Sequence, residues 1–136
     1  VVLLDRYVAS NAAYSAARVH QDADGAMVEW VRALEFDRLV LPRPSAQILL
    51  DVPVEVAEHR ARGREQEDPS RARDAYERDG GLQARTAAVY AGLAASSWMS
   101  PWFVVNGAQA DGEQVDVTRL AAELLNQTAE YDGMTR

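Results

Sequence analysis

The sequence contains no cysteine and no lysine among its 136 residues. Without cysteine the chain can form neither a disulfide framework nor a thiolate zinc site, which is compatible with the cytoplasmic location that we expect. Without lysine, no segment fits G-x-x-x-x-G-K-[ST], the loop whose lysine contacts nucleotide phosphates. This sequence therefore contains no such loop, and any phosphate recognition by these residues must be local.

Histidine is almost as scarce, with only His20 and His59 in the chain. The two lie far apart and have no cysteine or histidine at ligand spacing, which argues against a structural metal site. Ser10 and Ser15 have no histidine nearby, and no G-x-S-x-G segment exists to hold a nucleophilic serine. The sequence therefore favours neither a metalloprotein nor a serine hydrolase.

Basic residues are also few, because the sequence has 14 arginines against 21 acidic residues, which gives a net charge of −7. This balance argues against a general nucleic-acid surface, which needs an excess of basic groups. The apolar runs are too short for a membrane span, and the first residues lack the order of a signal peptide. The length allows one domain with a modest core, and we expect neither nucleic acid nor membrane as a partner.

The first residues combine an apolar run with a charged pair. Val1 to Leu4 predicts a strand buried on both faces of a parallel sheet, and Asp5 and Arg6 follow it. Ligands of such sheets bind beyond the carboxyl ends of the strands, so this pair is a candidate site. A structural ion pair between Asp5 and Arg6 explains the pattern equally well.

A helix with one polar and aromatic face is predicted next. Tyr7, Asn11, Tyr14 and Arg18 recur at spacings of four, three and four, which brings them to one side of a helix. Such a stripe is also common on helices that face solvent or a partner helix.

The remaining pattern predicts an α/β fold, a parallel sheet flanked by helices. Further strands are expected at Ala46–Leu50 and Trp102–Val105, and Asp24 is a candidate N-cap for the second helix. That helix is apolar on several sides, which suits either a helix enclosed in one domain or a dimer helix. The other helices are expected at Val54–Ala61, around the apolar repeat Leu82, Thr86, Val89 and Leu93, and after Asp116.

The window from His59 to Asp79 holds six arginines and six acidic residues. A solvated, salt-bridged helix pair would explain this composition. Arginine forks also neutralise phosphoryl groups during their transfer, and Gly63, Pro69 and Ser70 break the window into a loop that could close over a ligand.

Two stretches resemble one family. Val-Leu-Leu-Asp-Arg-Tyr-Val-Ala-Ser-Asn-Ala-Ala-Tyr, residues 2–14 with the valine at position 2, resembles the segment that binds deoxythymidine monophosphate (dTMP) in bacterial thymidylate kinases, particularly actinobacterial ones. The segments 60–64 and 68–79 resemble the lid of these enzymes and the helix after it. The resemblance implies a P-loop nucleoside monophosphate kinase fold whose amino-terminal part is missing. Residues 1–126 would form the carboxyl-terminal portion of a single domain, with the lid at about 60–73 and a disordered tail at 127–136.

The resemblance also implies a reaction, the transfer of a phosphoryl group from ATP to dTMP to give dTDP in deoxythymidine nucleotide biosynthesis. ATP, Mg²⁺ and a second copy of the chain in a homodimer are the implied cofactors and partner. The residues assigned to catalysis are Asp5, Arg6, Arg60, Arg64 and Arg71. Those assigned to the substrate are Arg6, Ser10, Asn11, Tyr14, Asp74, Tyr76 and Glu77. Those assigned to ATP are Arg60, Arg64, Arg71, Asn106, Gly107 and Ala108, and those assigned to the metal are Asp5 and Glu77.

Two alternatives remain open at this point. The chain could be a non-catalytic nucleotide-binding or dimerising remnant, which the missing phosphate loop favours, or part of another nucleoside monophosphate kinase. Under every hypothesis we expect these 136 residues alone to be inactive and poorly folded, because the resemblance implies that a strand and the phosphate loop precede them.

Overall fold

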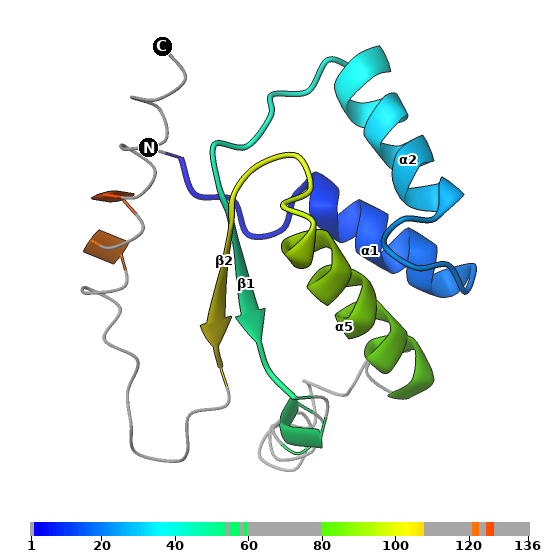
Figure 1. Ribbon diagram of the computed structural model, residues 1–136, viewed down its shortest axis with the longest axis vertical. Helices are drawn as coiled ribbons and strands as arrows, with labels where there is room; N and C mark the ends of the chain where they lie inside the picture. Colours follow the sequence, from blue (N-terminus) through cyan, green and yellow to red (C-terminus); the bar gives the residue numbers. More distant parts are fainter. Residues whose placement is uncertain are drawn as a thin grey trace, which may run out of the picture.

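The computed structural model describes residues 2–53, 55–57, 59, 80–107, 121–122 and 125–126. Three α-helices, α1 (Val8–Arg18), α2 (Ala26–Arg32) and α5 (Gly80–Ala95), lie to one side of two strands (Figure 1). The strands are β1 (Gln47–Asp51) and β2 (Trp102–Asn106), and a π-helical segment, η1 (Ala33–Arg38), continues α2. No helix within these ranges has both the length and the apolar character needed to cross a bilayer.

The strands β1 and β2 form a parallel pair, as the sequence predicts. Gln47 pairs with Trp102 at one end and Asp51 pairs with Asn106 at the other. The helix α5 precedes β2 in the chain and contacts it. The described residues therefore show a small parallel sheet with helices beside it, which agrees with the α/β class.

The strand predicted at residues 1–4 is wrong for the part that the structure describes. Residues 2–4 have no regular secondary structure, and Val2 and Leu3 are 84% and 85% exposed. An apolar run becomes a strand only when its backbone pairs with a neighbour, and the one sheet formed by the described residues contains β1 and β2 alone. Asp5 and Arg6 therefore follow an unpaired segment instead of a sheet strand.

The core lies where α1 packs against α5 and α2. Ala12, Ala13 and Ala16 are fully buried on α1, and such small side chains allow the neighbouring helices to approach closely. The predicted apolar repeat of α5 is confirmed, because Leu82, Thr86, Val89 and Leu93 are all buried. Arg85 of the same helix donates from Nε to the carbonyl oxygen of Ala17 (3.0 Å) and so ties α5 to the end of α1.

The start of α2 differs from the prediction in its capping residue. The N-cap is Gly25, not Asp24, and glycine has no side chain that could cap the helix. The Gln21 side chain caps the helix instead, because its Oε1 accepts a hydrogen bond from the backbone N–H of Met27 (2.7 Å). A capping side chain four residues before the N-cap residue is not part of the usual pattern, so sequence reasoning could not identify it.

The second helix has an inner and an outer face. Val28, Val31 and Phe36 are buried in the core, as expected for a helix enclosed in one domain. Trp30 is 59% exposed on the outer side, so the dimer alternative stays a prediction. In the helix predicted at Val54–Ala61, residues 55–57 and 59 are helical. The lid, the expected cap at Asp116 and the tail at 127–136 lie outside the described residues.

Candidate functional site

The backbone turns sharply at Arg6, immediately before α1. Arg6 has a φ of 65°, in the left-handed region that L-residues other than glycine seldom adopt. Tyr7 then takes an extended conformation as the N-cap of α1, and its hydroxyl donates to the carbonyl oxygen of Pro42 (3.0 Å). Strained backbone conformations of this kind gather at ligand sites, where surrounding contacts maintain them.

The side chain of Arg6 lies over an aromatic ring of α1. Its Cζ is 5.4 Å from the centroid of the Tyr14 ring, within the range of a cation–π contact. Tyr14 in turn meets Tyr90 of α5 edge to face, with ring centroids 6.4 Å apart and an interplanar angle of 86°. The helices α1 and α5 thus together fix the platform on which the guanidinium lies.

Arg6 has no ion-pair partner among the residues that the structure describes, and Asp5 has none either. The alternative of a structural ion pair between these two residues is therefore not supported. Arg32 shows the contrast, since its guanidinium binds both Glu29 and Asp37. The charge of Arg6 remains available for an anion that approaches from solvent.

Ser10 joins the same group of residues through Tyr90. Ser10 is buried on α1, and its hydroxyl lies close enough to the Tyr90 phenol to influence the pKa of that group. Burial raises the pKa of the Tyr90 phenol above its ordinary value of 10.0, and the Ser10 hydroxyl and the charge of Arg6 partly oppose this rise. Tyr90 is therefore a neutral phenol at physiological pH.

Sequence reasoning missed Tyr90. The available signal was an aromatic residue with a polar tip placed directly after Val89 and four residues after Thr86, at the border of the buried stripe of α5. Such a residue often contacts a polar group where a core meets a surface.

Asn11 has a partner that the sequence analysis also missed. Its Nδ2 donates to Oε1 of Glu35 in η1, at 2.8 Å. Short π-helical stretches often occur at functional sites, and here η1 brings a carboxylate to the exposed face of α1. No sequence signal marked Glu35, because the contact joins residues of two elements that are 24 positions apart in the chain.

The structure does not bring Asn106 and Gly107, two of the expected adenine-contact residues, to the residues around Arg6. Asn106 ends β2 beside Asp51, and the N–H of Gly107 donates to the carbonyl oxygen of Asp51 (2.8 Å). In Figure 1 this end of the sheet, marked by the arrowheads, is well separated from the start of α1. A Cβ at Gly107 would lie 2.6 Å from Cγ2 of Val52, so glycine allows the segments after β1 and β2 to approach closely.

Several other predicted site residues cannot be compared with the structure. Within the described part of the chain, no group of three or more potential metal ligands occurs. The predicted residues that lie outside the described part are Arg60, Arg64, Arg71, Asp74, Tyr76, Glu77 and Ala108.

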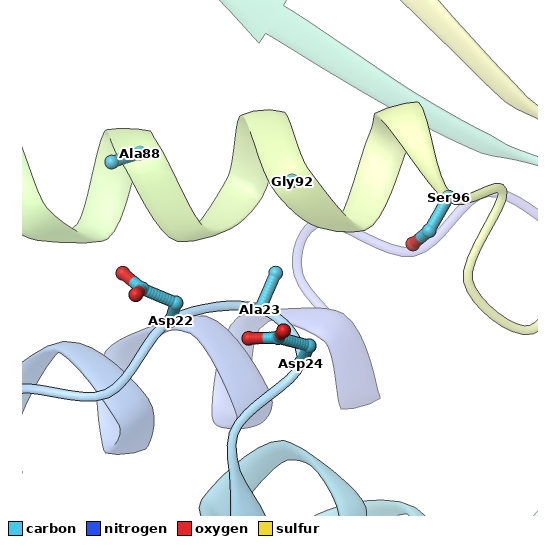
Figure 2. Close-up of a pocket in the computed structure, with 6 residues that line it drawn as sticks. All are labelled: Asp22, Ala23, Asp24, Ala88, Gly92 and Ser96. Carbon is cyan, nitrogen blue, oxygen red and sulfur yellow. The ribbon is translucent and has the colours of Figure 1, made fainter.

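A surface depression of about 400 Å³ lies elsewhere, between the loop before α2 and the outer side of α5 (Figure 2). Asp22 and Asp24 line one wall, and Ala88, Gly92 and Ser96 line the other. None of the predicted site residues contributes to it. Two carboxylates with no facing cation would repel a phosphate, so this depression is a poor candidate for a nucleotide site.

The chemistry of the Arg6 group is that of an anion site with a polar edge. A guanidinium with no carboxylate partner in the described region suits a phosphate monoester, to which it can donate two parallel hydrogen bonds. Tyr14 offers a flat wall, and the Asn11 amide offers both a donor and an acceptor. Together these groups could bind a small molecule that carries a phosphate and a polar ring.

Comparison with known proteins identifies the family. Residues 1–115 match the family model described as thymidylate kinase. Two relatives named thymidylate kinase, from Mycobacterium tuberculosis strains CDC 1551 / Oshkosh and ATCC 25618 / H37Rv, are each 59% identical to the chain over 124 residues. The alignment covers 91% of this chain and 55% of each relative, so the chain spans about half the length of these proteins. The chain belongs to the thymidylate kinase family.

Proposed function

We propose that the protein containing this chain transfers the terminal phosphoryl group of ATP to dTMP, giving dTDP for deoxythymidine nucleotide biosynthesis. One observation carries the proposal, the Arg6 guanidinium held over Tyr14 with no carboxylate partner in the described region. It occurs in a chain that is 59% identical to proteins named thymidylate kinase. Because the chain spans about half of those proteins, the activity of the whole protein is inferred from its relatives.

The acceptor would be bound by residues at the start of α1. Arg6 would hold the phosphate of dTMP, and Asn11 would hydrogen-bond the thymine edge. Tyr14 would lie beside the sugar, where it would crowd a 2′-hydroxyl. Ser10, which lies beside Tyr90, would complete the set of substrate-binding residues on α1. These roles rely on positioning and charge neutralisation, which dominate phosphoryl transfer, and require no covalent enzyme intermediate.

The donor side of the proposal rests on the family. Arg60, Arg64 and Arg71 would neutralise the ATP phosphates, with Asp74, Tyr76 and Glu77 on the acceptor side and Asn106, Gly107 and Ala108 near adenine. Mg²⁺, when bound, would neutralise charge on the phosphates, and Asp5 and Glu77 are its proposed ligands. Asp5 fits that role, since its exposed carboxylate has no ion pair among the described residues. A homodimer and a cytoplasmic location are part of the same proposal.

The test is a kinase assay on the full-length protein encoded by the gene that carries this chain. We expect turnover of dTMP with ATP, and we expect Arg6→Ala to lower kcat/KM roughly 10–150-fold, since charge-assisted hydrogen bonds contribute about 1.5–3 kcal/mol. Arg18→Ala, at the other end of α1, is the matched control and should change kcat/KM little.

Two results would contradict this proposal. A full-length protein that binds nucleotides without turning them over would support the non-catalytic remnant. A protein that prefers another nucleoside monophosphate would support the rival kinase. Turnover of dTMP that is unaffected by Arg6→Ala would instead remove Arg6 from the acceptor site.

A further inference from the structure

We propose that Glu35 is a positioning residue that fixes the orientation of the Asn11 amide and thereby sets which pyrimidine the site accepts. The ring it selects carries an N–H at position 3 and an oxygen at position 4. The inference deepens the proposed function, because it assumes that Asn11 contacts the base of a nucleoside monophosphate.

The geometry of η1 brings Glu35 to Asn11. Phe36 of this segment is buried in the core, and the backbone N–H of Leu41 donates to the carbonyl oxygen of Glu35 (2.9 Å), so the backbone at Glu35 is held from both sides. The neighbouring acid Asp37 binds Arg32, whereas Oε1 of Glu35 accepts from Nδ2 of Asn11 at 2.8 Å. Glu35 is thus the described carboxylate of η1 that contacts α1.

A carboxylate beside an amide determines which way the amide points. An ionised Glu35 can only accept hydrogen bonds, so it favours the Nδ2 group of Asn11 and repels Oδ1. Rotation of the amide by 180° would break a charge-assisted hydrogen bond and place two acceptors face to face. The preferred orientation keeps the second Nδ2 hydrogen and Oδ1 for a ligand.

The two orientations recognise different bases. Thymine and uracil present an acceptor at O4 and a donor at N3, so an amide that spans these positions must donate to O4 and accept from N3–H. Cytosine presents a donor at N4 and an acceptor at N3, and therefore needs the amide reversed. By holding the Asn11 amide in one orientation, Glu35 would weaken the binding of cytosine without touching the base itself.

The decisive variant is Glu35→Gln in the full-length protein, because glutamine keeps the size of the side chain and can donate to Oδ1 of a reversed Asn11. We would measure kcat/KM for dTMP and for the monophosphates of deoxyuridine and deoxycytidine. The preference for dTMP over deoxycytidine monophosphate should fall about tenfold, as expected for loss of one charge-assisted hydrogen bond. The preference for dTMP over deoxyuridine monophosphate should not change, since both bases share the same edge.

Glu29→Gln is the matched control. Glu29 is an exposed acid on the neighbouring α2 whose partner is Arg32, so its substitution should leave both preferences unchanged. If Glu35 only ties η1 to α1, Glu35→Gln would lower kcat/KM for all three substrates alike. That result, or unchanged ratios, would overturn the proposal.

Binding measurements separate this inference from the proposed function. Should the full-length protein lack kinase turnover, the proposed function fails, and titration calorimetry with the same three nucleotides decides the role of Glu35. Preferential binding of the thymine and uracil nucleotides that weakens in Glu35→Gln would support the inference. Equal binding of all three by the unsubstituted protein, or a preference that survives the substitution, would contradict it.

Discussion

At the scale of single residues, the site depends on side chains that support one another more than on any one contact. The Arg6 guanidinium lies over the Tyr14 ring, and the Tyr14 and Tyr90 rings meet edge to face. Tyr90 also lies beside Ser10, so one phenol of α5 is close to two side chains of α1. A change at Tyr90 should therefore act on residues that we propose to bind the substrate.

The first prediction at this scale concerns Tyr90→Phe, which removes only the hydroxyl. At neutral pH the variant should unfold more easily by about 1 kcal/mol, because the half-buried Tyr90 hydroxyl loses its polar interaction with the buried Ser10. The pKa of Tyr90 is raised above 10.0 by burial, so above pH 10 the unfolded chain releases this proton more readily than the folded chain. The stability contributed by Tyr90 is thus complete below pH 10 and declines as pH rises toward the folded-state pKa.

Urea unfolding of the full-length protein between pH 7 and pH 11 measures this effect. The free-energy difference between the unsubstituted protein and Tyr90→Phe should shrink as the pH rises above 10. Tyr131→Phe supplies a control for the other tyrosines of the chain. A difference that stays constant with pH would mean that Tyr90 is not buried as an un-ionised phenol.

The residues of the site were only partly predictable. Asn11 and Tyr14 lie three residues apart on α1, as the sequence periodicity predicted. Arg6 precedes the helix, and the periodicity gave no indication that its guanidinium lies over the Tyr14 ring. Tyr90 and Glu35 reach this face from other elements, through contacts that no local period encodes. Site residues that only tertiary packing brings together, such as Tyr90 and Glu35, are therefore the hardest to predict from sequence.

At the scale of elements, the approach of the loop before α2 to α5 depends on Gly92. A Cβ at Gly92 would lie 2.6 Å from Cβ of Ala23, closer than two such atoms can pack (Figure 2). Gly92→Ala should therefore destabilise the protein by about 1 kcal/mol net. Overpacking costs about 1–3 kcal/mol, and the higher helix propensity of alanine returns about 1 kcal/mol.

A double variant tests that explanation. With Ala23→Gly in place the clash is gone, so Gly92→Ala should now stabilise the protein by about 1 kcal/mol, and the sign of its effect reverses. Ala91→Gly, at the exposed neighbouring position, measures the propensity term alone. Thermal unfolding of the unsubstituted protein and the four variants gives these values. If the effect of Gly92→Ala on stability is the same with alanine or glycine at position 23, the steric explanation is wrong.

The elements themselves show where sequence patterns succeed and fail. The buried repeat of α5 and the parallel strands β1 and β2 were predicted, because their periodicity and bounding turns are local signals. The segment at residues 2–4 has an equally strong apolar pattern but forms no strand, since pairing is a tertiary event. The change from α2 to the π-helical η1 has no signal of its own in the sequence.

At the scale of the whole molecule, several large hydrophobic side chains of the described residues are exposed. Val2, Leu3 and Leu50 of the amino-terminal segment and β1 are all exposed, with Leu50 at 64%. Two paired strands alone form a marginal sheet, and exposed strands with apolar side chains invite association. Large apolar side chains that gather on a surface normally lie against another part of a protein or a partner.

We therefore expect the 136-residue chain, produced alone, to self-associate and to lack kinase activity. Sedimentation velocity at increasing concentration should show mass above that of one chain, and a hydrophobic dye should bind and fluoresce. Activity should be absent even from folded material, because a chain without lysine cannot supply the lysine of a phosphate-binding loop. The full-length protein, assayed in parallel, should bind less dye for each mole of chain. A monomeric chain with a cooperative thermal transition and measurable dTMP turnover would contradict both expectations, since it would show that the exposed apolar residues are harmless and that ATP is bound without this lysine.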